Sequence, residues 1–128
     1  MFVRFVVKFL DPDSGRRQGL FQAAWKLRDS GRLNAADWRR LERIRDWFNE
    51  NLEKPARLSL SARPNRKAQA ISWFKSTAAE HIDKMRQLQR VLETHGIAVE
   101  MIRTRRPGYV LYEDDFQVAA YPFSDTQT

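Results

Sequence analysis

The spacing of the apolar residues changes twice along this chain, and that change limits the folds open to it. Between residues 2 and 10 every second residue is apolar, the spacing of a strand with one buried face. From residue 20 to residue 95 apolar residues recur every three or four positions, which is typical of amphipathic helices. After Gly96 short apolar runs return, separated by turn residues. The sequence therefore predicts an α+β domain.

Three helices are expected in the middle of the chain. The first runs from Leu20 to Arg28, and the second begins after Asn34, whose side chain suits an N-cap. The link between them is so short that the two helices should form an antiparallel hairpin. Residues 53–68 are predicted to form a loop, and a third helix is predicted from about Gln69 to His95, with Gly96 just after its end.

The remaining strands are expected after Gly96, over residues 97–104, 109–112 and 116–121. The turn chemistry of Arg106-Pro-Gly-Tyr109 predicts a type II turn, so the three strands should form a meander. The predicted fold is a two-layer β-α-α-α-β-β-β domain over residues 1–123, with an antiparallel sheet covered on one face by three helices. Residues 124–128 form a polar tail that is expected to fray.

Composition narrows the class of protein. Apolar residues make up 42% of the 128, enough for a single core, and no window is long and apolar enough to cross a bilayer. Arg4 and Lys8 interrupt the N-terminal apolar stretch, so it suits a strand better than a signal peptide. The chain has no cysteine, which excludes disulfides and thiolate metal sites. A cytoplasmic protein without a cofactor or a membrane partner is expected.

The charge is distributed unevenly. The formal net charge is +7, yet no acidic residue occurs between Lys54 and Ala79, where six basic residues lie. Outside that segment the other 17 of the 23 basic residues are nearly balanced by 16 acidic residues. The second helix illustrates the balance, because its arginines at positions 39, 40, 43 and 45 are interspersed with carboxylates that can pair with them. The sequence predicts that this helix neutralises its own charge and that the 54–75 segment does not.

Uncompensated arginines and lysines favour contact with phosphate, since the guanidinium fork matches phosphate oxygens. The leading hypothesis is a non-enzymatic protein that binds DNA or RNA through this segment. A second basic cluster beside an aromatic residue extends the site if the ring stacks on an unpaired base, but a tyrosine packed across the turn with solvated arginines is the favoured explanation of that cluster. The predicted nucleic-acid-binding residues are Arg57, Arg63, Arg66, Lys67, Lys75, Arg103, Arg105, Arg106 and Tyr109.

Catalytic and metal-binding patterns are weak. His81 falls on the apolar face of the third predicted helix, which favours a core histidine over a general base. Asp11 and Asp13 in the first turn, and Glu113–Asp115 in the last, could bind Mg²⁺ for phosphodiester cleavage if the two turns met. Aspartate also suits turns for its own sake, so no metal site and no catalytic residue is assigned, and a metal-dependent nuclease is the third hypothesis.

The tryptophans support the second hypothesis, a protein-interaction or inhibitor module that is either a homodimer or docks on an acidic partner. Trp25, Trp38, Trp47 and Trp73 fall at the edges of the predicted helical stripes. Most such residues pack at helix boundaries, whereas an exposed tryptophan indicates a partner surface.

Several short motifs also resemble those of a family of small, uncharacterised bacterial proteins. They are Gly19–Trp25, Trp73–Lys75, His81–Met85, Arg103–Tyr109, Tyr112–Asp114 and Gln117-Val118. The likeness extends from about residue 19 to residue 123. Ser72 stands where that family often has cysteine, so any thiol role is absent here. The resemblance implies a bacterial or mobile-element origin and brings no activity, cofactor or site with it.

Overall fold

The computed structural model describes residues 1–12, 15–54 and 70–128, which form an antiparallel six-stranded sheet and three helices. The strands are β1 (Phe2–Leu10), β2 (Arg17–Gly19), β3 (Ile71–Lys75), β4 (Glu100–Thr104), β5 (Tyr109–Glu113) and β6 (Gln117–Tyr121). The helices are α1 (Leu20–Asp29), α2 (Ala35–Asn51) and α4 (Ala79–Thr94). The α+β class predicted from the sequence is confirmed.

Strand β1 lies at the centre of the sheet. One of its edges pairs with β4 along five residues. The opposite edge is shared by two short strands, because Val3 pairs with Phe74 of β3 while Val6 pairs with Gly19 of β2. Beyond β3 the sheet continues through β6 to β5. A nine-residue strand therefore holds together segments from the start, the middle and the end of the chain.

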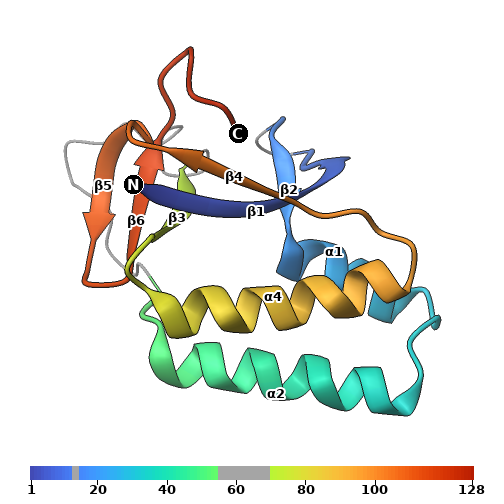
Figure 1. The fold of residues 1–128 in the computed structure, drawn as a ribbon. Coiled ribbons are helices and arrows are strands. Elements are labelled where there is room, and N and C mark those ends of the chain that lie inside the picture. The colour runs from blue at the N-terminus through green and yellow to red at the C-terminus, as the bar shows by residue number, and fades with distance from the viewer. Residues whose placement is uncertain (13–14, 55–69) are drawn as a thin grey trace.

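The helices lie on one side of the sheet, as predicted, and form two tiers. Figure 1 shows α4 between the sheet and α2, with α1 beside α4 near β2. Asn34 caps α2 as the sequence predicts, because its side-chain oxygen accepts a hydrogen bond of 2.8 Å from the amide of Asp37. Gly31 and Gly96 follow the ends of α1 and α4 with positive φ angles, the conformation that favours glycine there.

Each face of the sheet contributes to a buried apolar cluster. The helix-facing core includes Phe5 and Val7 of β1 and continues into the facing residues of all three helices. A second apolar cluster occupies the other face, with Trp73 at its centre. Its remaining members are Phe2, Val6, Ile71, Ile102 and Val118. The C-terminal segment lies on this side of the sheet (Figure 1), and Arg4 donates to the carbonyl of Thr128.

The predicted third helix begins too early. Residues 71–75 form strand β3, which pairs with β1 and β6, and the helix starts at Ala79. Ile71, Phe74 and Ala78 have helical spacing, but Ile71-Ser-Trp-Phe-Lys75 also alternates between the two faces of a strand. Two flanking strands supply backbone partners for this short apolar run, so tertiary pairing decides between the two patterns.

The predicted pairing of the 97–104 and 109–112 segments is also wrong. β4 pairs with β1, and β5 forms its hairpin with β6. Gly108 does adopt a positive φ, but its value of 135° lies well outside a type II turn. Glycine is needed at this position because a Cβ there would lie 2.0 Å from the carbonyl oxygen of Tyr121.

Residues 124–128, expected to fray, make hydrogen bonds to the rest of the domain. The hydroxyl of Thr126 lies 3.3 Å from the carbonyl oxygen of Arg106 and accepts from the amide of Phe123.

Within the described ranges, none of the helices has the length and apolar character needed to cross a bilayer.

Candidate nucleic-acid interface

The structure describes only part of the basic segment predicted as the main site. Arg57, Arg63, Arg66 and Lys67 lie outside the described residues. Lys75 is the last residue of β3, where its Nζ lies 2.6 Å from Oε2 of Glu113 on β5. The sequence segment around Lys75 contains no acid, yet the sheet brings one to it. Its charge is therefore matched within the fold.

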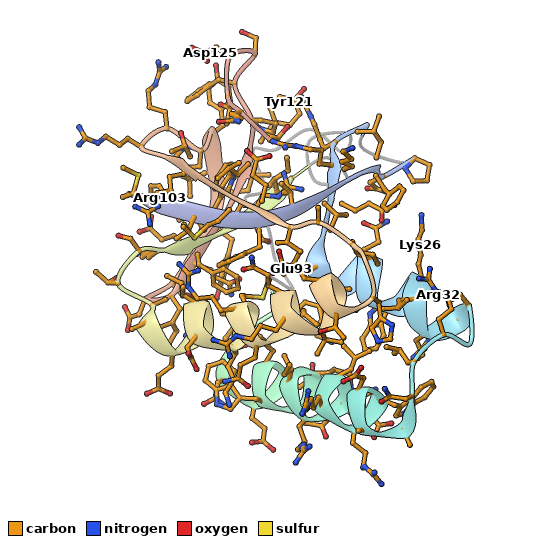
Figure 2. The ribbon with its side chains drawn as sticks, turned by 45° about the vertical axis from the view of Figure 1, so that its right-hand side comes forward. Lys26, Arg32, Glu93, Arg103, Tyr121 and Asp125 are labelled. Atoms are coloured by element: carbon orange, nitrogen blue, oxygen red, sulfur yellow. The ribbon has the colours of Figure 1, made fainter. Side chains whose placement is uncertain are left out.

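The second predicted cluster lies on the sheet layer. Arg103 is exposed on β4 opposite Val3, and Arg105 and Arg106 follow just after the strand. Arg106 lies 4.9 Å above the ring of Phe123 and 4.0 Å from the carboxylate of Asp125. Figure 2 shows Arg103 at the sheet and Asp125 on the side of the sheet away from the helices.

Tyr109 begins β5 with about half of its surface exposed, and its ring packs edge-on against Phe123 at 4.7 Å. The structure therefore brings Arg106 and Tyr109 together around one phenylalanine. This arrangement leaves the arginines accessible, but the tyrosine is already in an aromatic contact. Stacking on a nucleic-acid base would have to use its remaining exposed surface.

A stronger candidate lies between α2 and α4. A groove of about 520 Å³ runs between these helices, and four of its lining residues are cationic, namely Arg40, Arg43, Lys84 and Arg90. The other described lining residues are Ile44, Gln87, Val91 and Thr94, so no carboxylate belongs to that lining. Apolar residues form its floor, because Ile44 and Val91 are buried between the helices. The result is a basic groove with an apolar base, which we call the α2–α4 groove.

Two of the four cations are engaged. Arg40 forms a 3.5 Å ion pair with Asp37, and Nζ of Lys84 lies 5.6 Å from the ring centre of Trp47. Arg43 and Arg90 form no side-chain ion pair with any other described residue. The guanidinium groups of Arg43 and Arg90 therefore border the groove without a carboxylate partner among the described residues.

The expected self-neutralisation of α2 is therefore only partial. Of its four arginines, Arg40 pairs with Asp37 and Arg45 pairs with Asp46. Glu42, which the sequence offered to the arginines, instead accepts a hydrogen bond of 2.6 Å from the indole of Trp38. Glu42 keeps its negative charge, but it forms no ion pair with an arginine among the described residues.

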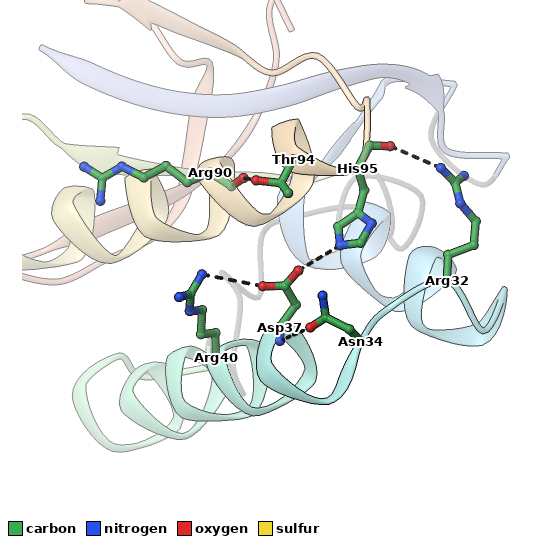
Figure 3. Close-up of polar contacts among 7 residues, drawn as sticks. All are labelled: Arg32, Asn34, Asp37, Arg40, Arg90, Thr94 and His95. Carbon is green, nitrogen blue, oxygen red and sulfur yellow. Dashed lines mark hydrogen bonds and ion pairs between the residues drawn. The ribbon is translucent and has the colours of Figure 1, made fainter.

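Polar contacts join α2 and α4 next to Arg40 and Thr94, two lining residues of the α2–α4 groove (Figure 3). Asp37 in the first turn of α2 is buried, and its carboxylate lies 2.9 Å from Nε2 of His95 at the end of α4. Arg32, in the turn before α2, donates to the carbonyl of His95. His95 therefore fixes the end of α4 against the start of α2.

His81 lies at the opposite end of the helix pair and is buried, as the core interpretation predicts. Its Nε2 lies 2.8 Å from the carbonyl oxygen of Asn51, the last residue of α2. The ring stacks on Phe116 at 4.5 Å and meets Trp47 edge-on at 4.8 Å. These contacts join α2, α4 and the β5–β6 turn, which assigns His81 a structural role.

The two carboxylate turns considered for a metal do not meet. Asp11 follows β1 next to β2, whereas Glu113 ends β5 at the other end of the strand order and Asp114 and Asp115 come directly after it. Asp13 lies outside the described residues. In the described ranges no group of three or more histidines and carboxylates is close enough to hold a metal ion.

Asp114 instead organises the turn before β6. Its carboxylate accepts hydrogen bonds from the amides of Phe116 and Gln117, from the Gln117 side chain and from the hydroxyl of Tyr112. Burial acts to raise the pKa of Asp114, but these hydrogen bonds outweigh burial and hold the pKa below its usual value.

The α2–α4 groove was missed because each helix was considered alone. Its cations come from segments more than 40 residues apart, and each segment also contains acids. Aligning the i, i+3 stripe of Arg40 and Arg43 with that of Lys84, Gln87 and Arg90 would have revealed it.

The chain matches no family model, no curated protein and no solved structure.

Proposed function

We propose that the protein binds nucleic acid through the phosphate backbone, with the α2–α4 groove as a principal contact. The observation that carries this proposal is the groove lining, which has four cationic side chains and no carboxylate among its described members. Arginine forks bind phosphate oxygens bidentately, and Arg43 and Arg90 have no ion-pair partner in the described part of the chain that would compete.

The dimensions of the groove suit a short run of phosphates. Lys84 and Arg90 are six residues apart on α4, which corresponds to about 9 Å along a helix axis. Nucleotides of one strand in duplex DNA rise by about 3.4 Å each, so this length spans two to three steps. The described lining contains no aromatic ring for base stacking, and we therefore expect contact with the backbone and little dependence on base sequence.

The net charge of +7 supports the same function. The basic segment with Arg57, Arg63, Arg66 and Lys67 stays part of the proposal on sequence grounds, as does the sheet-side cluster of arginines. These would act as additional electrostatic contacts rather than as a source of specificity.

The test is fluorescence anisotropy with labelled single- and double-stranded DNA and RNA over a series of salt concentrations. Three phosphate contacts on duplex DNA, from Arg43, Lys84 and Arg90, give a slope of log K against log salt of about −2.7, from about −0.9 per contact. Replacing Arg43 and Arg90 by glutamine should bring the slope to about −0.9. At 0.1 M salt the affinity should fall roughly 60-fold.

A matched control replaces two exposed lysines outside the groove, Lys8 and Lys26, by glutamine. The control loses the same net charge, so a small effect there and a large effect in the groove variant would assign binding to the groove. Equal losses in both variants would show that only total charge matters. No binding of wild type at low salt would remove the proposal.

A second candidate function, self-association, rests on strand β5. This strand ends the sheet path, and it exposes about half the surface of Tyr109 and Val110. An exposed edge with apolar side chains can pair with the same edge of another chain. Light scattering with size-exclusion chromatography tests this: a dimer that becomes a monomer in Val110→Lys supports it, and a wild-type monomer at high concentration refutes it.

A further inference from the structure

A cavity opens where the edge of β1 passes from one partner strand to the other. Val3 pairs with β3 and Val6 pairs with β2, which leaves Arg4 and Phe5 between the two short strands. Both residues line a cavity of about 550 Å³ that extends to α1 and α2. This volume lies within the usual range for small-molecule sites. We call it the β1 cavity.

Aromatic side chains form much of its wall. Phe21 of α1, Phe48 of α2 and Phe74 of β3 line the cavity, and Phe48 meets the other two rings at centroid distances of 5.3 and 6.0 Å. Trp25 and Trp73 also contribute to the lining. A flat apolar body would be well matched to these surfaces, because aromatic rings pair favourably edge-on or with offset stacking.

Trp73 adds an unused hydrogen-bond donor. The residue is 1% exposed, and its Nε1 is buried without an acceptor in the described structure. Buried indole N–H groups are normally satisfied, because a buried donor without an acceptor loses its hydrogen bonds to water and gains none in return. Because Trp73 lines the cavity, its indole N–H signal should report on a ligand bound there.

Arg4 adds a positive charge without a carboxylate partner among the described residues. Its guanidinium is partly buried and donates to two carbonyl oxygens, those of Arg17 and Thr128. Burial and the nearby charges of Arg17 and Arg16 lower the pKa of Arg4 to about 10, so the group is protonated at neutral pH. Glu53, the one acidic residue in the described lining, is exposed and forms no ion pair with Arg4 in the described structure.

We propose that the β1 cavity binds a small aromatic monoanion, such as an aromatic carboxylate, with its ring among Phe21, Phe48 and Phe74 and its anionic group on Arg4. A single charge is the best match, because Arg45 in the described lining is paired with Asp46 and Lys54 is exposed. Arg4 is then the one partly buried cation of that lining without a carboxylate partner, and a dianion would keep an uncompensated charge there. This inference does not depend on nucleic-acid binding, because the described linings of the β1 cavity and the α2–α4 groove have no residue in common.

The experiment is an NMR titration of the ¹⁵N-labelled full chain with 2-naphthoate, and with neutral 2-naphthamide as the isosteric comparison. The chain has four tryptophans and therefore four indole N–H signals, which single Trp→Phe variants assign. We expect a saturable shift of the Trp73 signal with naphthoate. The amide should bind at least about tenfold more weakly, since a hydrogen bond to a charged group contributes about 1.5–3 kcal/mol.

Variants separate this site from the groove. Arg4→Gln should remove the preference for naphthoate, and Arg4→Lys, which keeps the charge but not the fork, should bind naphthoate more weakly than wild type. Arg43→Gln should leave naphthoate affinity unchanged while it weakens nucleic-acid binding. The proposal fails if the indole signal of Trp73 does not shift at millimolar naphthoate, or if naphthamide binds as tightly as naphthoate. Both measurements use the wild-type protein, so neither depends on whether a variant folds.

Discussion

Replacing Asp37 by alanine removes the contact that fixes the start of α2 to the end of α4. The carboxylate is buried and lies 2.9 Å from Nε2 of His95, with a further 3.5 Å ion pair to Arg40. A hydrogen bond involving a charged group contributes about 1.5–3 kcal/mol, and an exposed ion pair on one helix adds about 0.3–0.5 kcal/mol. We therefore expect the free energy of unfolding to fall by about 2–3 kcal/mol.

Urea denaturation of Asp37→Ala, His95→Ala and the double variant measures this contribution. With a slope of about 2 kcal/mol per molar urea, the midpoint of Asp37→Ala should fall by about 1 M. The double-mutant cycle should give a coupling energy of about 1.5 kcal/mol or more. The exposed Arg45–Asp46 pair is the control, for which the coupling should be below about 0.5 kcal/mol. A coupling for Asp37–His95 as small as the control would refute the reasoning.

The same substitution should act in the opposite direction on nucleic-acid binding. Asp37 is the carboxylate that holds Arg40, so its removal releases that guanidinium toward the α2–α4 groove. One added phosphate contact raises affinity at 0.1 M salt by up to about eightfold. A variant that is less stable but binds more tightly would separate the two roles, whereas weaker binding would mean that the groove needs the Asp37–His95 contact to keep its shape.

Three further predictions concern stability. Gly108→Ala should destabilise the domain by about 3 kcal/mol or more, because a Cβ would lie 2.0 Å from a carbonyl oxygen at a positive φ, and a thermal melt with Gly19→Ala as control measures it. Trp73→Ala should cost about 3–5 kcal/mol in chemical denaturation, compared with under about 1 kcal/mol for exposed Trp38→Ala. Asp114 has a lowered pKa in the folded state, so its contribution is complete above the pKa of the unfolded carboxyl and is lost as the pH falls through the folded pKa. Unfolding measured from pH 7 to pH 2.5 should therefore show a smaller acid-side loss in Asp114→Asn than in wild type, and equal losses would contradict the role given to its hydrogen bonds.

Local signals predicted much of the secondary structure correctly. Alternation defines β1, Asn34 marks the start of α2, and Gly96 follows the end of α4, because each depends on residues close together in the chain. Strand β3 was missed because its five residues fit both periods, and only its neighbours β1 and β6 decide between them. Strand β2 is three residues long, too short for a periodic signal.

The candidate sites were harder to predict, for a related reason. The cations of the α2–α4 groove become a surface only when two helices pack, and the β1 cavity exists only because two short strands share one edge of β1. Lys75 shows the converse, since the acid that neutralises it is 38 positions away in the sequence. Counting charges along the sequence therefore did not predict the α2–α4 groove, where positive charge accumulates, or the neutralisation of Lys75 by Glu113.

The position of β1 also has a consequence during synthesis on the ribosome. This strand needs partners from residues 17–19, 71–75 and 100–104, so its pairing cannot be complete until the last of these has emerged. In the interval its alternating Val3, Phe5 and Val7 form a segment prone to intermolecular association. Arg4 and Lys8 interrupt that segment, and such charges act as gatekeepers against aggregation. Arg4 would then protect the nascent chain before it takes its place in the β1 cavity.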